Sequence, residues 1–170
     1  MILHLVRHPK PAIAPGICYG RLDISAENVA AVATCLRDEL PPGLPVWSSP
    51  LRRCRELATL LHPTPRLDDR LAEMNFGDWE GRPWDSIPRA EIDAWAADVA
   101  GYVPPGGESP LLLQQRALAF VANLAVPEAV IVTHAGVIRT LLAHWQGLPR
   151  DEWTRLEFAY GSRTTVEVRR

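Results

Sequence analysis

Two nearly continuous apolar runs restrict the folds open to this 170-residue chain. One run covers residues 2–6 and the other covers residues 129–133. Such runs are typical of strands buried on both faces, as in parallel sheets that helices cover on each side. Amphipathic segments lie between and after the runs, which favours a layered α/β fold. We predict a three-layer α/β/α sandwich with a mostly parallel sheet of roughly six strands.

The other elements follow from apolar spacing and turn residues. Helices are expected in four stretches: from near residue 25 to residue 40, from an N-cap at Ser49 to residue 61, from 110 to 125, and after residue 134. Short strands are expected at 44–47 and 66–67, and a final hairpin is expected from strands 154–159 and 163–168.

Residues 69–110 differ in character from the rest of the chain. They are rich in proline and carry five aromatic residues: Phe76, Trp79, Trp84, Trp95 and Tyr102. We interpret this segment as loops and short helices that form a lid over one end of the sheet. No repeat, linker or low-complexity stretch divides the sequence, so residues 1–170 are expected to form one domain.

Charge and cysteine content narrow the classes of partner and compartment. The net charge is −2 and the basic residues are interleaved with acids, so neither nucleic acid nor an anionic membrane is expected as a partner. Cys18, Cys35 and Cys54 are widely spaced and form no CxxC pair, which indicates free thiols. No leader precedes the first strand and no apolar run reaches membrane-spanning length, so a cytoplasmic protein is expected.

Both apolar runs lead into a histidine. Arg7 and His8 close the first run, and His134, followed by Ala135 and Gly136, closes the second. The carboxyl ends of parallel strands form the ligand-binding edge of open α/β sheets. Arginine offers a permanently charged planar fork of donors that suits a phosphate, and small residues let a ligand approach the backbone. Together with Arg53 and Glu73, these residues indicate phosphate-ester chemistry. Taken alone, His134 fits a buried histidine bonded to a backbone carbonyl nearly as well.

The middle of the chain adds an arginine and an acid, although the residues alone leave alternatives open. Arg53 lies in the first turns of a predicted helix, but Arg52 and Arg55 compete for the same role, and side chains about 100° apart cannot all face one site. Glu73 lies among apolar neighbours and could act as a general acid near neutral pH. The same reasoning does not distinguish Glu73 from two nearby acids, Asp78 and Glu80, as the general acid.

Five segments taken together resemble the histidine phosphatase superfamily, which has the phosphoglycerate-mutase-like fold. They occur in the expected order and spacing: Arg7-His8, residues 49–53, residues 71–81, residues 106–109 and residues 132–136. Within the superfamily, residues 18–23 and 79–109 look most like the α-ribazole phosphatases of cobalamin nucleotide-loop assembly. The resemblance implies a phosphomonoesterase that acts on a small-molecule phosphate ester.

The resemblance also assigns roles to individual residues. His8 would be the nucleophile that forms a phosphohistidine, and Glu73 would be the general acid and then the base. The phosphoryl group would be bound by four residues: Arg7, Arg53, His134 and Ala135. Positions near the substrate would be Tyr19, Gly20, Arg21 and Glu108. No metal or other cofactor is implied.

One residue departs from the family pattern, because Pro9 stands where the family usually has glycine. Proline removes a backbone donor at that position. Arg-His-Pro variants resemble members of the ribazole phosphatase branch, so we interpret Pro9 as compatible with activity.

Other activities stay open at this point. A phosphoglycerate mutase usually carries insertions and a C-terminal tail, and because this chain ends directly after its last predicted strand we expect hydrolysis instead. A short phosphohistidine protein phosphatase resembles the chain less through the Glu73 region. A broad phosphatase of sugar phosphates or fructose-2,6-bisphosphate fits the same residues, as does a non-catalytic phosphate-binding module. The sequence does not define the leaving group or the oligomeric state.

Overall fold

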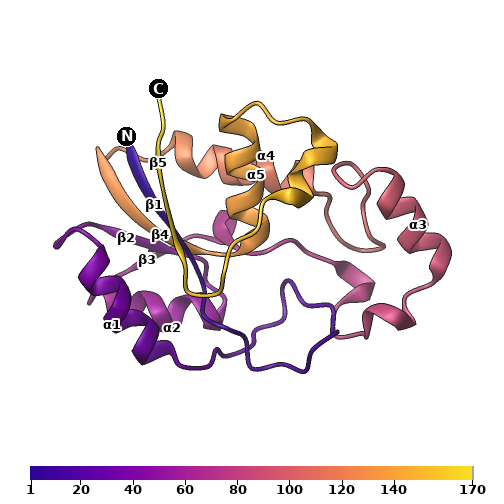
Figure 1. Cartoon of the computed structure of the whole chain (residues 1–170), viewed down its shortest axis with the longest axis horizontal. Coiled ribbons are helices and arrows are strands. Elements are labelled where there is room, and N and C mark those ends of the chain that lie inside the picture. The colour runs from indigo at the N-terminus through magenta and orange to yellow at the C-terminus, as the bar shows by residue number, and fades with distance from the viewer. Residues whose placement is uncertain (170) are drawn as a thin grey trace.

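A computed structural model describes residues 1–169, with a five-stranded sheet between two pairs of helices (Figure 1). The strands are β1 (Ile2–Arg7), β2 (Val46–Ser48), β3 (Arg66–Leu67), β4 (Glu128–Thr133) and β5 (Arg163–Glu167). The α-helices are α1 (Val29–Glu39), α2 (Arg52–Leu61), α3 (Arg89–Ala97), α4 (Pro110–Ala122) and α5 (Ala135–Trp145). Short 3-10 helices cover Asp69–Leu71, Gly77–Trp79, Trp84–Ser86 and Arg150–Arg155.

The strand order is β3-β2-β4-β1-β5, and only β5 runs antiparallel to its neighbour. β1 and β4 pair in parallel from Ile2 opposite Glu128 to Arg7 opposite Thr133. Each strand is followed directly by a histidine, so this register brings His8 and His134 to the same edge of the sheet. The His8 backbone N–H donates to the Thr133 carbonyl at 3.0 Å, which extends the ladder by one residue.

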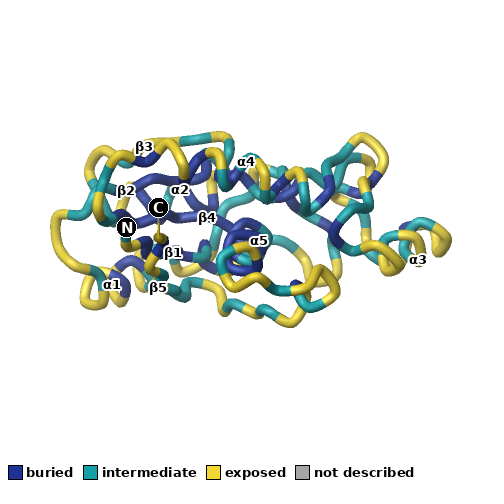
Figure 2. The backbone as a smooth tube through the Cα atoms, turned by 90° about the horizontal axis from the view of Figure 1, so that it is seen from above, coloured by how far each residue is buried: buried dark blue, intermediate teal, exposed yellow. Residues whose placement is uncertain are grey.

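Each face of the sheet has its own hydrophobic core. Leu3, Leu5 and Ile131 face α4 and α5, whereas Val6 and Val132 face α1 and α2. Buried backbone accordingly runs through the centre of the molecule, with exposed segments around it (Figure 2). The three-layer α/β fold predicted from the two apolar runs is confirmed, and the sheet is mostly parallel.

Residues 69–110 consist of loops, three 3-10 helices and α3, which projects away from the sheet in Figure 1. This lid segment has a small core of its own, built on Trp79 and joined by the buried Cys18. The Trp84 and Trp95 rings stack at 5.6 Å, and Trp79 stacks on Tyr102 at 5.8 Å. Most of the aromatic residues therefore order the lid itself.

The predicted strand at 154–159 is wrong, and with it the final hairpin. Residues 150–155 form a 3-10 helix and residues 156–159 form a loop. Two carbonyl groups of this loop accept from side chains and not from a neighbouring strand: that of Leu156 accepts from Arg139, and that of Phe158 accepts from Arg7. The sheet thus has five strands where roughly six were predicted.

Two helix starts also differ from prediction. α1 begins at Val29 and not near Ser25, because Asn28 adopts a left-handed backbone conformation at φ 55°. α2 begins at Arg52 with Leu51 as its N-cap, and Ser49 lies before the helix. None of the helices within residues 1–169 combines the length and apolarity needed to cross a membrane.

Candidate active site

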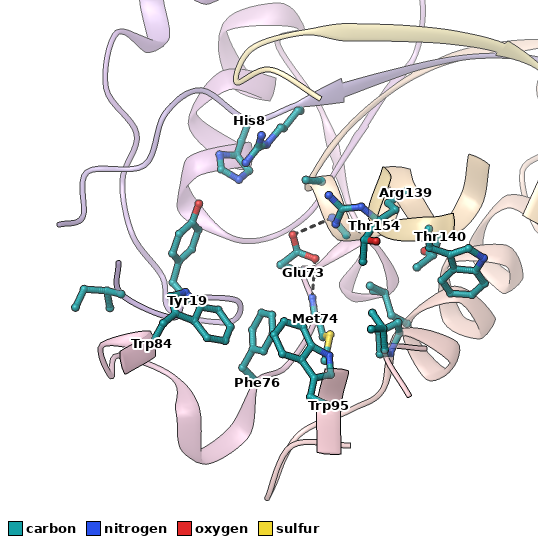
Figure 3. Close-up of a pocket in the computed structure, with 18 residues that line it drawn as sticks. His8, Tyr19, Glu73, Met74, Phe76, Trp84, Trp95, Arg139, Thr140 and Thr154 are labelled. Atoms are coloured by element: carbon teal, nitrogen blue, oxygen red, sulfur yellow. Dashed lines mark hydrogen bonds between the residues drawn. The ribbon is translucent and has the colours of Figure 1, made fainter. Parts of the chain in front are cut away.

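A cavity of about 340 Å³ opens at the carboxyl ends of β1 and β4. Five of the predicted site residues line it: Arg7, His8, Tyr19, Glu73 and Ala135. Figure 3 shows His8 at one end of the cavity, Glu73 near its centre and the lid aromatics Phe76, Trp84 and Trp95 at the other end. The other five predicted residues lie outside the lining: Gly20, Arg21, Arg53, Glu108 and His134.

His8 is buried and held in one orientation by two contacts. Its Nδ1 lies 2.6 Å from the Pro9 carbonyl oxygen, which can only accept, so Nδ1 carries the proton. Nε2 therefore has the free electron pair, and it accepts from Arg53 Nε at 3.3 Å. Burial first, and then the Arg53 charge, lowers the pKa of His8 to about 3. At neutral pH His8 is consequently a neutral imidazole with a defined tautomer, as a nucleophile requires.

Arg53 has no exposed surface, and it lies behind His8. Nη1 donates to the Leu22 carbonyl at 2.8 Å, and Nη2 donates to the Gly20 carbonyl at 2.6 Å. Its competitor Arg52 lies on the surface and pairs with Glu56 at 2.6 Å. Arg53 therefore lies on the inward face of α2 and Arg52 does not, as expected from the rotation of about 100° per residue along a helix.

His134 is the N-cap residue of α5 and is fully buried. Its Nε2 lies 2.8 Å from Ser49 Oγ and 3.4 Å from Cys54 Sγ. The rings of His134 and His8 are 5.1 Å apart in an edge-to-face arrangement. Burial, followed by the charge of Arg53, lowers the pKa of His134 well below its usual range, so this imidazole is also neutral.

Glu73 is the only carboxyl group that lines the cavity among residues 1–169. Oε1 accepts from the Met74 N–H at 2.9 Å, and Oε2 accepts from the Gly136 N–H at 3.1 Å. The absence of a side chain at Gly136 is what permits this approach, because an added Cβ would collide with the Glu73 carboxylate. The two acids that the sequence left as alternatives to Glu73 do not line the cavity: Asp78 is exposed, and Glu80 points into the loop around Gly20.

Glu108 braces the lid and does not line the cavity. It accepts from Arg116 at 2.7 and 3.0 Å and from the Asn75 N–H at 2.9 Å, and it lies 3.5 Å from Arg21. Burial alone would raise the pKa of Glu108, but hydrogen bonds and charge from Arg116 outweigh it and lower the pKa. Glu108 and Arg21 are thus paired with each other and with neighbouring segments.

Two residues of the site were missed by sequence reasoning. Tyr160 packs under Arg7, whose guanidinium lies 3.7 Å from the ring centroid, and its hydroxyl is 3.0 Å from that of Tyr19. Arg139 lines the cavity from α5 and points toward Glu73 (Figure 3). A charged residue between apolar positions of a predicted buried helix was the available signal for Arg139. No sequence signal marked Tyr160.

Comparison with known proteins agrees with this geometry. The sequence matches the histidine phosphatase superfamily (branch 1) over residues 3–170. It is 32% identical over 148 residues to a glucosyl-3-phosphoglycerate phosphatase of Mycolicibacterium vanbaalenii, covering 77% of this chain and 65% of the relative. It is 27% identical over 134 residues to an adenosylcobalamin/alpha-ribazole phosphatase of Escherichia coli, covering 72% and 66%. The chain thus spans just under two thirds of the length of both curated relatives.

A solved structure supports the same relationship. The mycobacterial glucosyl-3-phosphoglycerate phosphatase Rv2419c, in complex with VO3, superimposes with a TM-score of 0.84 at 29% identity. The superposition covers 98% of this chain and 92% of the mycobacterial chain.

Proposed function

Because the chain belongs to the histidine phosphatase superfamily, we propose that it is a phosphoric monoester hydrolase acting through a phosphohistidine at His8. The observation that carries the proposal is the juxtaposition of a neutral His8, with its electron pair on Nε2, and the Glu73 carboxyl group in one cavity. A nucleophile and a proton donor on the same bound ester are the two groups that metal-independent phosphoryl transfer to histidine requires.

In the first step, His8 Nε2 attacks phosphorus while the bond from phosphorus to the ester oxygen breaks. Nδ1 keeps its proton and its hydrogen bond to the Pro9 carbonyl, which stabilises the positive charge that develops on the ring. Glu73 acts as the general acid and gives a proton to the departing alkoxide. Arg53 Nε, which donates to His8 Nε2 in this structure, loses this acceptor as the nitrogen forms its new bond and becomes free to donate to a phosphoryl oxygen.

Fixed positive charge stabilises the phosphoryl group as its charge spreads over three oxygens. Arg7 lines the cavity, and its buried Nε has no hydrogen-bond partner among residues 1–169, so this donor is available to an oxygen of the substrate. Ala135 opens α5 next to His8, where free N–H groups and the helix dipole favour an anion. In the second step, Glu73 takes a proton from a water molecule as the water oxygen attacks phosphorus. The bond between phosphorus and His8 Nε2 breaks, and phosphate is released.

Two observations favour different leaving groups. The far end of the cavity is walled by Phe76 and the stacked pair Trp84 and Trp95, and the Nε1 of Trp95 is buried without a partner among residues 1–169. This wall suits a flat aromatic leaving group and supports α-ribazole 5′-phosphate as the substrate. Arg139, which lies beside Glu73, suits instead a carboxylate close to the ester oxygen, as in glucosyl-3-phosphoglycerate.

The test is phosphate release from both esters and from p-nitrophenyl phosphate, all in EDTA. We expect the wild type to hydrolyse p-nitrophenyl phosphate in EDTA. Loss of this hydrolysis in His8→Ala, together with a drop in its rate of about 10²- to 10⁴-fold in Glu73→Gln, would support the assigned roles. Near-normal rates in either variant would refute them. A value of kcat/KM for one natural ester about a hundredfold above the other would identify the leaving group.

A further inference from the structure

The Glu80 carboxylate lies outside the cavity and is nonetheless among the most heavily hydrogen-bonded groups of the molecule. Oε2 accepts from the backbone N–H groups of Gly20 and Leu22 at 2.9 and 3.2 Å. Oε1 accepts from those of Arg21 and Phe76 at 2.8 and 3.1 Å. A single carboxylate therefore collects three consecutive N–H groups of one loop and a fourth from the lid.

The same loop holds the arginine that contacts the nucleophile. The carbonyl groups of Gly20 and Leu22 accept from the two terminal nitrogens of Arg53 at 2.6 and 2.8 Å. Arg53 Nε in turn donates to His8 Nε2 at 3.3 Å. Residues 20–22 thus turn their N–H groups to Glu80 and two of their carbonyl groups to Arg53, which links Glu80 to His8 through one continuous set of hydrogen bonds.

The fourth N–H connects Glu80 to the acid. Phe76 belongs to the short segment that begins at Glu73, and the backbone of that segment also bonds the Glu73 carboxylate through the Met74 N–H at 2.9 Å. The loop and this segment are in close contact, because a Cβ added at Gly20 would collide with the Met74 carbonyl oxygen. Glu80 is therefore bonded both to the loop behind the nucleophile and to the segment that carries the acid.

We propose that Glu80 is a positioning residue that sets the placement of His8 relative to Glu73. The inference rests on the proposed function, in which these two groups act on opposite ends of one bond. Their spacing matters because a misplacement of about 1 Å can cost about 10²-fold in rate. Hydrogen bonds to an ionised acceptor are about twice as strong as neutral ones, which suits a carboxylate to holding two segments together.

The test is the variant Glu80→Gln, which keeps the size of the side chain but replaces one acceptor oxygen with a donor. At least two of the four backbone N–H groups then lose their acceptor. We expect kcat for p-nitrophenyl phosphate to fall about 10- to 100-fold, with KM changed less than kcat, because phosphate binding by Arg7 is retained. Amide hydrogen exchange at residues 20–22 should accelerate in the folded variant.

The matched control is Glu91→Gln, the same substitution on another lid carboxylate. Glu91 accepts from Trp79 Nε1 at 2.6 Å and makes no contact with the loop at 20–22 among the described hydrogen bonds. A wild-type kcat in Glu80→Gln, an equal loss in Glu91→Gln, or unchanged exchange at residues 20–22 would overturn the proposal. If Glu80→Gln does not fold, Glu80→Asp, which is shorter by one methylene, carries the same test.

Failure of the proposed function can be told apart from failure of this inference. A wild-type protein that hydrolyses no ester would refute the hydrolase. The exchange rates and the ¹⁵N signals of the His8 ring would still report whether Glu80→Gln disturbs the loop and, through Arg53, the nucleophile. Unchanged ring signals would refute the link from Glu80 to His8 whatever the turnover.

Discussion

This protein should be measurably less stable in acid, because His8 takes up a proton more readily in the unfolded chain than in the folded protein. The pKa of His8 is lowered from 6.5 to about 3 in the folded state, chiefly by burial and by Arg53, so between these pH values the unfolded chain binds a proton that the folded protein does not. Stability linked to His8 is therefore complete above pH 6.5 and declines as the pH falls toward 3. From the two pKa values, the loss between pH 7.5 and pH 4 is about 3 kcal/mol.

The perturbation is His8→Gln, whose side-chain carbonyl can replace Nε2 as the acceptor for Arg53 Nε. Urea unfolding at several pH values from 7.5 to 4 gives the stability of each protein. His134 contributes to the acid sensitivity of both, so the difference between the two curves reports His8. We expect the wild type to lose about 3 kcal/mol more than the variant over this range. Parallel curves would refute both the lowered pKa and the neutral nucleophile that depends on it.

Two further predictions concern the groups around Glu73. Gly136→Ala should lower kcat for p-nitrophenyl phosphate by about tenfold or more, because the new methyl group displaces the Glu73 carboxylate from the Gly136 N–H; an unchanged kcat would show that this contact is dispensable. If Arg139 binds a carboxylate near the ester oxygen, Arg139→Gln should lower kcat/KM for 3-phosphoglycerate about tenfold more than for glycerol 3-phosphate. The control Arg89→Gln, on the exposed side of α3, should leave the ratio of the two kcat/KM values unchanged. Equal losses on both esters in Arg139→Gln would exclude a carboxylate contact.

The central sheet was predictable because its signal is local. In β1 and β4 apolar residues fill both faces, and few other structures bury such a run. The segment at 154–159 has a similar apolar pattern in Leu156 and Phe158, but the carbonyl groups of these two residues accept hydrogen bonds from Arg139 and Arg7. Competition from side chains so distant in sequence does not appear in a pattern of hydrophobicity.

The site residues also differ in how far local sequence predicts their positions. His8 and Glu73 lie in the cavity as their motifs predicted, whereas Glu108 and Arg21 do not line it. Glu108 forms ion pairs with Arg21 and with Arg116, a residue that no motif marked. Which of several charged groups faces a cavity depends on pairings of this kind, and those are determined by the folded chain as a whole.

The parallel pairing of β1 with β4 has a consequence for how activity is acquired. Ile2 pairs with Glu128 and Arg7 pairs with Thr133, so the two histidines meet only after most of the chain has been brought back onto its first strand. Pairings this distant in sequence carry a large loop-closure cost and form slowly. The lid, by contrast, gathers most of its aromatic core from residues 76–102. During refolding, recovery of lid fluorescence should therefore precede recovery of turnover, which makes catalysis itself the signal that the last long-range contacts are in place.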